Sequence, residues 1–125
     1  MDTLMQKARQ ARENAFCPYS HYAVGAALLT KDGRIFTACN VENAAYPLCT
    51  CAERTAFCEA VAAGYRDFTA IAICGGREGT PPADACPPCG ACRQIMAQFC
   101  EGDFRILLED GTHTLDMLLP VRFTL

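Results

Sequence analysis

The 125-residue chain has the length of one domain, and we treat residues 1–125 as a single domain. With 51% hydrophobic and 20% charged residues it can fill a core, which excludes a disordered chain. The net charge of −3 and the scattered basic residues argue against a nucleic-acid partner. The same charge balance favours a small ligand of low charge as the partner. No apolar run approaches the length of a membrane span.

The chain contains 10 cysteines, which in a short secreted protein would suggest a framework of disulfides. Residues 1–7, however, have an early acid and lack the apolar segment of a signal peptide. We therefore expect reduced thiols and a cytoplasmic protein. Cys39, Cys58, Cys74 and Cys100 fall within apolar patterns, where a thiol behaves as a small hydrophobic group.

The first predicted element is a helix, because Leu4, Ala8, Ala11 and Ala15 recur at helical spacing before Pro18 ends the pattern. Two strands follow, and the turn-forming Lys31-Asp32-Gly33 joins them as a hairpin. The remaining predicted elements are a helix over 51–63 closed by Gly64, a strand over 70–74, a loop over 75–88, a helix over 90–100, strands over 104–108 and 112–115, and a helical turn over 116–119.

Two of these segments carry specific expectations. The hairpin strands span 22–29 and 34–41, and Gly25 in the first one would let another backbone approach closely. The run 70–74 has no polar face, which is typical of a strand covered on both sides. The order of helix, hairpin, then helix and strand twice predicts an α/β fold with a mixed sheet of about five strands and helices on both faces.

Three cysteines form the candidate metal site. Cys51 and Cys89 lie where two predicted helices begin, and Cys92 follows Cys89 on the same helix face. The free N–H groups and the dipole of a helix N-terminus stabilise thiolates there. Three cysteines are one ligand short of a closed structural zinc site, so the fourth position can hold a water.

Glu53 is the candidate proton carrier, because it lies two residues after Cys51 and within reach of a metal-bound water. The competing interpretation is a capping box from Thr50 to Glu53, which would make the carboxylate structural. Arg54 and Arg93 closely follow the ligand cysteines and are expected to donate to the sulfurs, which draws negative charge away from the site.

Other interpretations of the cysteines stay open. Cys86 and Cys89 form a CxxC motif that suits a redox pair, and Cys86 would also complete a four-cysteine structural site. Cys49 is a similar spare ligand. His21 and His113 are interpreted as surface or turn residues.

The motifs Cys51-Ala52-Glu53 and Pro88-Cys89-Gly90-Ala91-Cys92 resemble the zinc signature of the cytidine deaminases, in the small form that uses cysteine where others use histidine. The similarity covers nearly the whole chain, including Pro18-Tyr19-Ser20, Val24 to Leu28, Asn40 to Tyr46 and Cys92-Arg93-Gln94. It implies the family's three-layer sandwich, one zinc ion (Zn2+) per subunit, and a homotetramer with active sites shared between subunits.

The resemblance also implies a reaction, the zinc-dependent hydrolytic deamination of cytidine and deoxycytidine to uridine and deoxyuridine in pyrimidine salvage. Zinc-bound hydroxide would attack C4 while Glu53 shuttles the protons. The resemblance implies that Asn40 and Glu42 bind the ribose, and that the main-chain N–H groups of Ala52 and Cys89 orient the reacting groups. It implies that Tyr22, which stands where the family usually has Phe, packs against the pyrimidine, and that Phe123 inserts into a neighbouring site. Arg54, Arg93 and Gln94 would support the ligands.

Three alternatives remain beside this reaction. A deaminase of a nucleoside antibiotic such as blasticidin S shares the zinc signature, but the ribose motif from Asn40 to Asn43 is not expected in it. A nucleotide deaminase would need basic residues for a phosphate, and the chain has none between Asn40 and Cys51. A non-catalytic zinc module would have four sulfur ligands.

Overall fold

The computed structural model describes residues 2–82 and 85–125. Its elements, in chain order, are α1 (Asp2–Arg12), β1 (Tyr22–Thr30), β2 (Ile35–Cys39), the short η1 (Tyr46–Leu48), α2 (Ala52–Ala62), β3 (Phe68–Arg77), α3 (Gly90–Phe99), β4 (Arg105–Leu108), β5 (Gly111–Thr114) and α4 (Leu115–Leu118). Within the described ranges, none of the helices is long and apolar enough to cross a membrane.

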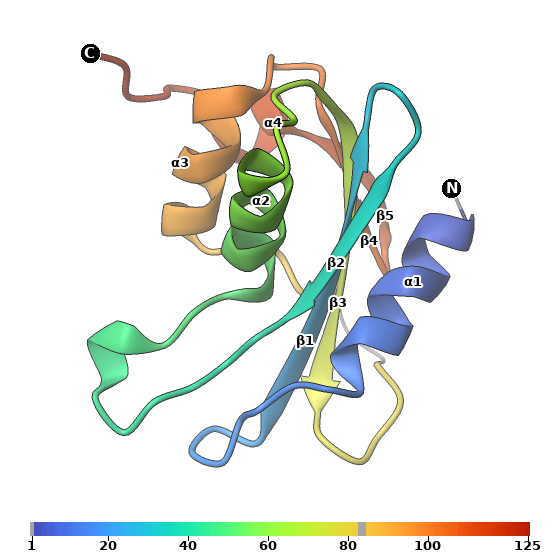
Figure 1. The fold of residues 1–125 in the computed structure, drawn as a ribbon, viewed down its shortest axis with the longest axis vertical. Helices are drawn as coiled ribbons and strands as arrows, with labels where there is room; N and C mark the ends of the chain where they lie inside the picture. The colour runs from blue at the N-terminus through green and yellow to red at the C-terminus, as the bar shows by residue number, and fades with distance from the viewer. Residues whose placement is uncertain (1, 83–84) are drawn as a thin grey trace.

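The strands form one mixed sheet in the order β2-β1-β3-β4-β5. Neighbouring strands run antiparallel except β3 and β4, which are parallel. Helix α1 covers one face of the sheet, and α2 and α3 cover the other (Figure 1). The predicted α/β architecture, with a mixed five-stranded sheet between two helical layers, is therefore confirmed.

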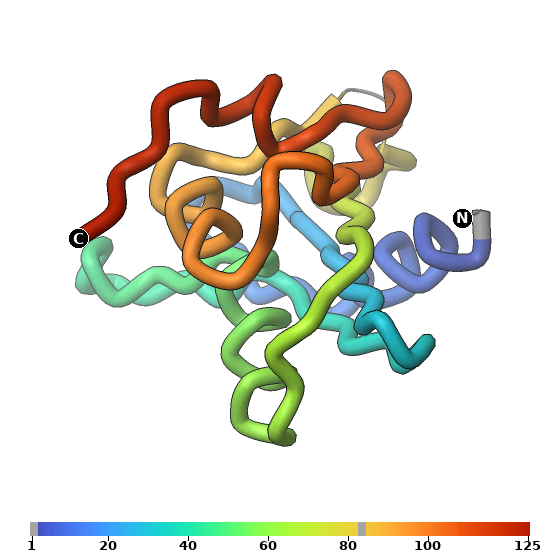
Figure 2. Tube along the Cα trace, turned by 90° about the horizontal axis from the view of Figure 1, so that it is seen from above, coloured from blue at the N-terminus to red at the C-terminus, as the bar shows by residue number. Residues whose placement is uncertain are grey.

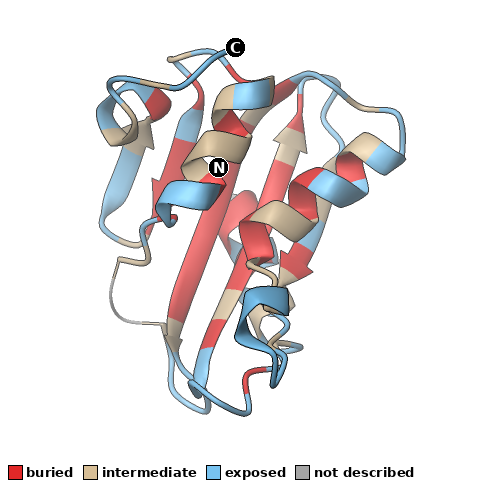
Figure 3. Cartoon of the chain, turned by 90° about the vertical axis from the view of Figure 1, so that its left-hand side faces the viewer, coloured by how far each residue is buried: buried red, intermediate tan, exposed pale blue. Residues whose placement is uncertain are grey.

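The central strand β3 is buried on both faces, as its run of apolar residues predicts. Ile71 and Ile73 pack on the side of α2 and α3, whereas Ala70, Ala72 and Cys74 pack on the side of α1. The small residues on the second side let α1 lie close to the sheet. Figure 3 shows the buried positions concentrated along the central strands.

Aromatic rings fill the core between the sheet and α2 and α3. Phe57 of α2 lies 5.1 Å from the Phe68 ring in an edge-to-face pair and 6.0 Å from the Phe99 ring in a stacked pair. Such contacts add to the apolar burial of the rings. This packing fixes how α2 and α3 lie on the sheet and therefore where their N-termini meet.

Helix α1 packs its backbone directly on β1 at Gly25. A Cβ atom at this position would lie 2.0 Å from the carbonyl oxygen of Ala8 and 2.6 Å from the nitrogen of Arg12, so only glycine fits. The close approach predicted for Gly25 is confirmed. The helix ends at Arg12 and not near residue 17, because the chain turns there and Phe16 donates its N–H to Asn40 in the segment after β2.

Candidate metal centre and active site

The N-termini of α2 and α3 meet at the three predicted ligands. Cys51 and Cys89 are the N-cap residues of α2 and α3, with extended backbones and no side-chain capping bond. Cys92 lies in the first turn of α3. The three sulfur atoms all lie within 4.8 Å of one another. Because the two N-cap thiols are not used for capping, they can face a shared point.

The donor set fits a zinc ion. Sulfurs at about 2.3 Å from a tetrahedral zinc lie about 3.8 Å apart. This separation is compatible with three sulfurs that all lie within 4.8 Å of one another. Cys92 is buried, Cys51 is half-buried and Cys89 is exposed, so the cluster is open on one side. In the described part of the chain this cluster contains three cysteines and excludes Cys86 and Cys49, so the arrangement does not support the four-cysteine structural site.

The cluster favours negative charge. A hydrogen bond from Cys92 lowers the pKa of Cys51 to about 6, with further lowering by Cys89 and by the positive charge of Arg54. The same bond to Cys51, together with burial, raises the pKa of Cys92. One sulfur therefore carries the charge while its neighbour keeps its proton. A divalent cation at this point would let the remaining thiols lose their protons.

Glu53 is buried beside the cluster, with 5% of its surface exposed. Burial raises the pKa of its carboxyl group to about 7, and a hydrogen bond from Cys92 partly opposes this shift. The structure does not support the competing interpretation of Glu53 as part of a capping box, because α2 begins at Ala52 with Cys51 as its N-cap, and Thr50 donates its hydroxyl to the carbonyl of Leu48. The carboxyl group can thus exchange a proton near neutral pH.

A pocket of about 250 Å³ opens over this centre, lined by Cys51, Cys89 and Glu53. Its other walls come from β1, the segment after β2, the start of α2 and the loop before α3: Val24, Asn40, Glu42, Cys49, Thr50, Ala52, Cys86 and Pro87. Five of the residues singled out from the sequence as ligands, proton carrier or ribose contacts therefore share one cavity. Ala52 is fully buried, and as the first residue of α2 its N–H lacks a partner within the helix.

Asn40 and Glu42 lie in the segment after β2, where their side chains bond to β1 and to the loop before it. Asn40 accepts from the Val24 N–H and donates to the Tyr22 carbonyl, each at 2.9 Å. Glu42 accepts from the Ser20 N–H at 3.1 Å and from the Ser20 hydroxyl at 2.5 Å. The hydroxyl bond holds the pKa of Glu42 below its ordinary value, so this side of the pocket carries a fixed negative charge.

Both arginines bind main-chain carbonyls next to the ligands. Arg54 donates to the Cys49 carbonyl at 3.0 Å, and Arg93 donates to the carbonyls of Pro88 at 2.8 Å and Leu118 at 2.7 Å. Each side chain therefore anchors the segment that leads into a ligand cysteine. The charge of Arg54 also reaches the cluster, because it contributes to the lowered pKa of Cys51.

Two residues singled out from the sequence, Gln94 and Phe123, are not among those that line the pocket. Gln94 donates its amide to the Phe123 carbonyl at 3.2 Å, which ties the C-terminal segment to α3. That segment runs past α3, away from α1 (Figure 2). Phe123 is 67% exposed and is not among the residues that line the pocket of its own chain.

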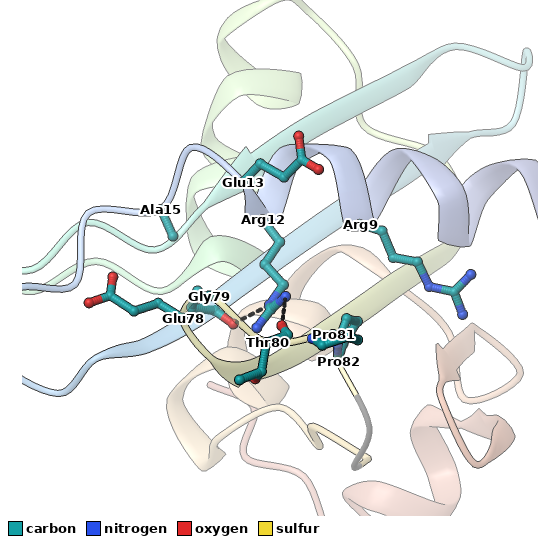
Figure 4. Close-up of a pocket in the computed structure, with 10 residues that line it drawn as sticks. Arg9, Arg12, Glu13, Ala15, Glu78, Gly79, Thr80, Pro81 and Pro82 are labelled. Carbon is teal, nitrogen blue, oxygen red and sulfur yellow. Dashed lines mark hydrogen bonds between the residues drawn. The ribbon is translucent and has the colours of Figure 1, made fainter.

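A larger cleft, of about 740 Å³, lies between α1 and the loop after β3 (Figure 4). Its central side chain is Arg12, whose guanidinium donates to the carbonyls of Arg77 and Thr80 at 2.8 Å and to that of Ala23 at 3.0 Å. These bonds occupy the guanidinium in holding the loop to α1. The residues that line this cleft include none of the candidate metal ligands, proton carrier or ribose contacts.

The mixed α/β sheet and the open three-thiol centre beside a buried acid define the class of a zinc-dependent hydrolase. The chain matches the family described as "Cytidine and deoxycytidylate deaminase zinc-binding region" over residues 1–107. It therefore belongs to the cytidine and deoxycytidylate deaminase family.

Individual relatives agree with this assignment. The chain is 47% identical to a cytidine deaminase of Sporosarcina psychrophila over 129 aligned positions, covering 99% of this chain and 91% of the relative. The crystal structure of cytidine deaminase from Burkholderia pseudomallei superposes with a TM-score of 0.86 at 45% identity and covers 98% of both chains. A blasticidin-S deaminase of Bacillus cereus is more distant, at 30% identity over 81% of this chain and 76% of the relative.

Proposed function

We propose that this protein catalyses the hydrolytic deamination of cytidine and deoxycytidine to uridine and deoxyuridine, with release of ammonia. The observation that carries the proposal is the shared pocket, which is lined both by Cys51, Cys89 and the buried Glu53 and by the polar residues Asn40 and Glu42. A reactive end and a sugar-binding end thus lie within one small cavity.

The three thiolates would hold one zinc ion per subunit, which lowers the pKa of a coordinated water and so supplies a nucleophile at neutral pH. Glu53 takes a proton from the attacking water and delivers it to N3 of the pyrimidine as C4 becomes tetrahedral. The carboxyl group then passes the second proton to the amino group, which leaves as ammonia. A pKa of about 7 suits both directions of this transfer.

Substrate binding is assigned to the opposite wall. Asn40 and Glu42 would bind the ribose 3′-hydroxyl, since an amide and a carboxylate together can donate to it and accept from it. Tyr22 would pack against the pyrimidine. The N–H groups of Ala52 and Cys89, at the starts of the two helices, would orient the attacking oxygen and the amino group.

We further propose a cytoplasmic homotetramer that serves pyrimidine salvage. The 10 cysteines are all free, which suits a reducing compartment. Tyr46, Leu48, Val121 and Phe123 are each more than half exposed, and apolar side chains of this size favour subunit contacts. Phe123 would reach a neighbouring active site. Sedimentation at micromolar concentration tests the assembly, and a monomer would contradict it.

The decisive experiment follows the ultraviolet absorbance of cytidine after addition of the zinc-loaded protein. We expect turnover of cytidine and deoxycytidine and none of adenosine, deoxycytidylate or blasticidin S. Turnover of blasticidin S without cytidine would move the assignment to the antibiotic deaminases. Absence of turnover with every substrate, together with X-ray absorption showing four sulfur ligands, would favour the non-catalytic zinc module.

A further inference from the structure

The turn between α1 and β1 contains the segment Pro18-Tyr19-Ser20, to which the proposed reaction gives no role. Ser20 is exposed and is not among the residues that line the pocket, whereas Glu42 lines it. The two side chains are nevertheless bonded, because the Ser20 hydroxyl donates to Oε2 of Glu42 at 2.5 Å. Ser20 therefore contacts the candidate sugar-binding end of the pocket from outside the pocket.

The Glu42 carboxylate is held by donors from this turn alone. Its Oε1 atom accepts the N–H groups of Tyr19 at 3.0 Å and of Ser20 at 3.1 Å, and its Oε2 atom accepts the Ser20 hydroxyl. A carboxylate offers about four acceptor positions, about two on each oxygen. Within the described residues both positions on Oε1 are occupied, so the open acceptor position is on Oε2, the oxygen that Ser20 holds.

The direction of the Ser20 hydroxyl proton is set by a second neighbour. The Tyr22 N–H donates to the Ser20 oxygen at 3.0 Å, which occupies one lone pair of the hydroxyl. A hydroxyl has a single proton to give, and an ionised carboxylate can only accept. The proton therefore points to Glu42. The pKa of Glu42 is lowered chiefly by this bond, which agrees with an ionised acceptor.

Main-chain bonds hold the turn against the segment that contains Glu42. Phe16, before the turn, donates its N–H to the Asn40 carbonyl at 3.0 Å, and the Glu42 N–H donates to the Phe16 carbonyl at 2.8 Å. The turn itself is closed by the bond from the His21 N–H to the Cys17 carbonyl at 2.9 Å. The turn thus presents its donors to the carboxylate from a fixed position.

We propose that Ser20 is a positioning residue, whose hydroxyl fixes Oε2 of Glu42 so that the open acceptor position of this oxygen receives the 3′-hydroxyl of the nucleoside. The inference rests on the proposed deaminase function and deepens it, because it names a residue that sets the selectivity for a sugar hydroxyl. Without the Ser20 hydroxyl, Oε1 keeps its two N–H donors, but Oε2 loses the bond that fixes it. The contact to the sugar then weakens.

Ser20 acts on binding and not on the chemical step. The sugar lies away from the C–N bond that breaks, so its contact with Glu42 stabilises the ground state and the transition state alike. Loss of such uniform binding raises KM and leaves kcat unchanged. A merely structural role of Ser20 would instead reduce the turnover of nucleosides with and without the 3′-hydroxyl equally, and would lower the melting temperature.

The test compares cytidine with 3′-deoxycytidine on the zinc-loaded enzyme and on its Ser20→Ala variant. We expect Ser20→Ala to raise KM for cytidine about fivefold with kcat within about twofold, which is the effect of one lost hydrogen bond. For 3′-deoxycytidine, kcat/KM of the variant should stay within about twofold of wild type, because the group that Glu42 binds is missing. Equal losses with the two substrates, or an unchanged KM for cytidine, overturn the inference.

A double-mutant cycle with Glu42→Ala separates positioning from direct contact with the substrate. In the Glu42→Ala background, Ser20→Ala should leave kcat/KM for cytidine unchanged, since the carboxylate through which Ser20 acts is absent. A further loss in the double variant would mean that Ser20 contacts the substrate itself, and it would overturn the inference.

Zinc content and melting temperature are measured for each variant, and Thr112→Ala, which removes an exposed hydroxyl on β5, is the matched control. If Ser20→Ala does not fold, Ser20→Cys, whose thiol is a weak donor, replaces it. A wild-type enzyme that is inactive on cytidine overturns the proposed function and the inference with it. An active wild type with an unaffected Ser20 variant overturns the inference alone.

Discussion

The two helix starts that form the candidate site have similar backbone arrangements but carry different functional side chains. In both, the N-cap residue is a cysteine in extended conformation, and an arginine a few residues later binds a carbonyl just before that cysteine. The start of α2, however, contributes one sulfur and the buried acid Glu53. The start of α3 contributes two sulfurs and has no acidic residue in its first turn.

This difference divides the work between the two helices. The start of α3 is suited to metal binding, since its two thiols share one helix face. The α2 end adds the proton chemistry, because burial raises the pKa of Glu53 to about 7. Metal binding and catalysis should therefore be separable by substitution, with changes at α3 removing the metal and changes at Glu53 removing the reaction.

The largest effect on activity is expected from Glu53→Ala. Without its carboxyl group the enzyme loses its proton carrier, which reduces kcat by about 10²- to 10⁴-fold. Zinc should remain at one ion per subunit, because the three sulfurs are intact. Steady-state kinetics with cytidine and metal analysis of the same preparation check both halves of the prediction. Full activity in this variant would exclude Glu53 from the mechanism.

The matching change at α3 is Cys89→Ser, which replaces a soft ligand by a hard one. We expect the purified variant to contain far less than one zinc per subunit and to lose activity with the metal. Its melting temperature should fall toward that of chelator-treated wild type. Stoichiometric zinc in Cys89→Ser would show that the division between the two helix starts is wrong. Cys58→Ala, at an exposed cysteine of α2, is the matched control.

A smaller effect is expected from Arg54→Gln. Glutamine can still donate to the Cys49 carbonyl, so the fold should be kept, but the positive charge that helps lower the pKa of Cys51 is lost. Residues that support metal ligands in this way contribute about 10- to 100-fold to metal affinity or activity. Competition with a chelator and kcat for cytidine measure the two contributions.

Arg93→Gln tests the corresponding arginine at the start of α3. Arg93 bonds two carbonyls, those of Pro88 and Leu118, so its replacement should also loosen the C-terminal segment. We expect a lower melting temperature in Arg93→Gln than in Arg54→Gln. Equal melting temperatures in the two variants would argue against an anchoring role for Arg93.

Local sequence patterns, meaning residue type and spacing along the chain, predicted the fold well. The two-sided burial of 70–74, the close approach at Gly25 and the left-handed Gly64 after α2 each follow from residue type and spacing, and all three are confirmed. Element ends were less predictable. β3 continues to Arg77 because Gly75 and its neighbour pair with β1 through the main chain, a contact that side-chain patterns do not encode.

In the candidate site, too, some features follow from local sequence patterns and others depend on the fold. The spacing of Cys51, Cys89 and Cys92 predicts ligands at helix starts, and the structure brings their sulfurs together. Which cysteine is not a ligand depends on distances across the fold, so the position of Cys86 outside the three-sulfur cluster could not be predicted from the spacing along the chain. The CxxC spacing of Cys86 was its only signal, and that signal pointed to redox or metal chemistry.

The last prediction concerns stability and not activity, and it contrasts the two ends of α3. Cys89 and Cys92 lie at its start, whereas Cys100 follows its end, buried in the core. Burial raises the pKa of Cys100 from 9.0 to about 12, so the folded chain keeps this proton after the unfolded chain has lost it. The contribution of a neutral Cys100 is therefore complete below pH 9.0 and is lost as the pH rises toward about 12.

We expect this thiol to reduce the free energy of unfolding by about 1.4 kcal/mol per pH unit in that range. Urea unfolding of the zinc-loaded protein between about pH 8 and 11, under reducing conditions, measures the slope. Cys100→Ala should flatten the slope by this amount, because alanine has no proton to lose, although the lost packing lowers stability at every pH. An identical slope in wild type and Cys100→Ala would mean that burial does not hold the proton on Cys100.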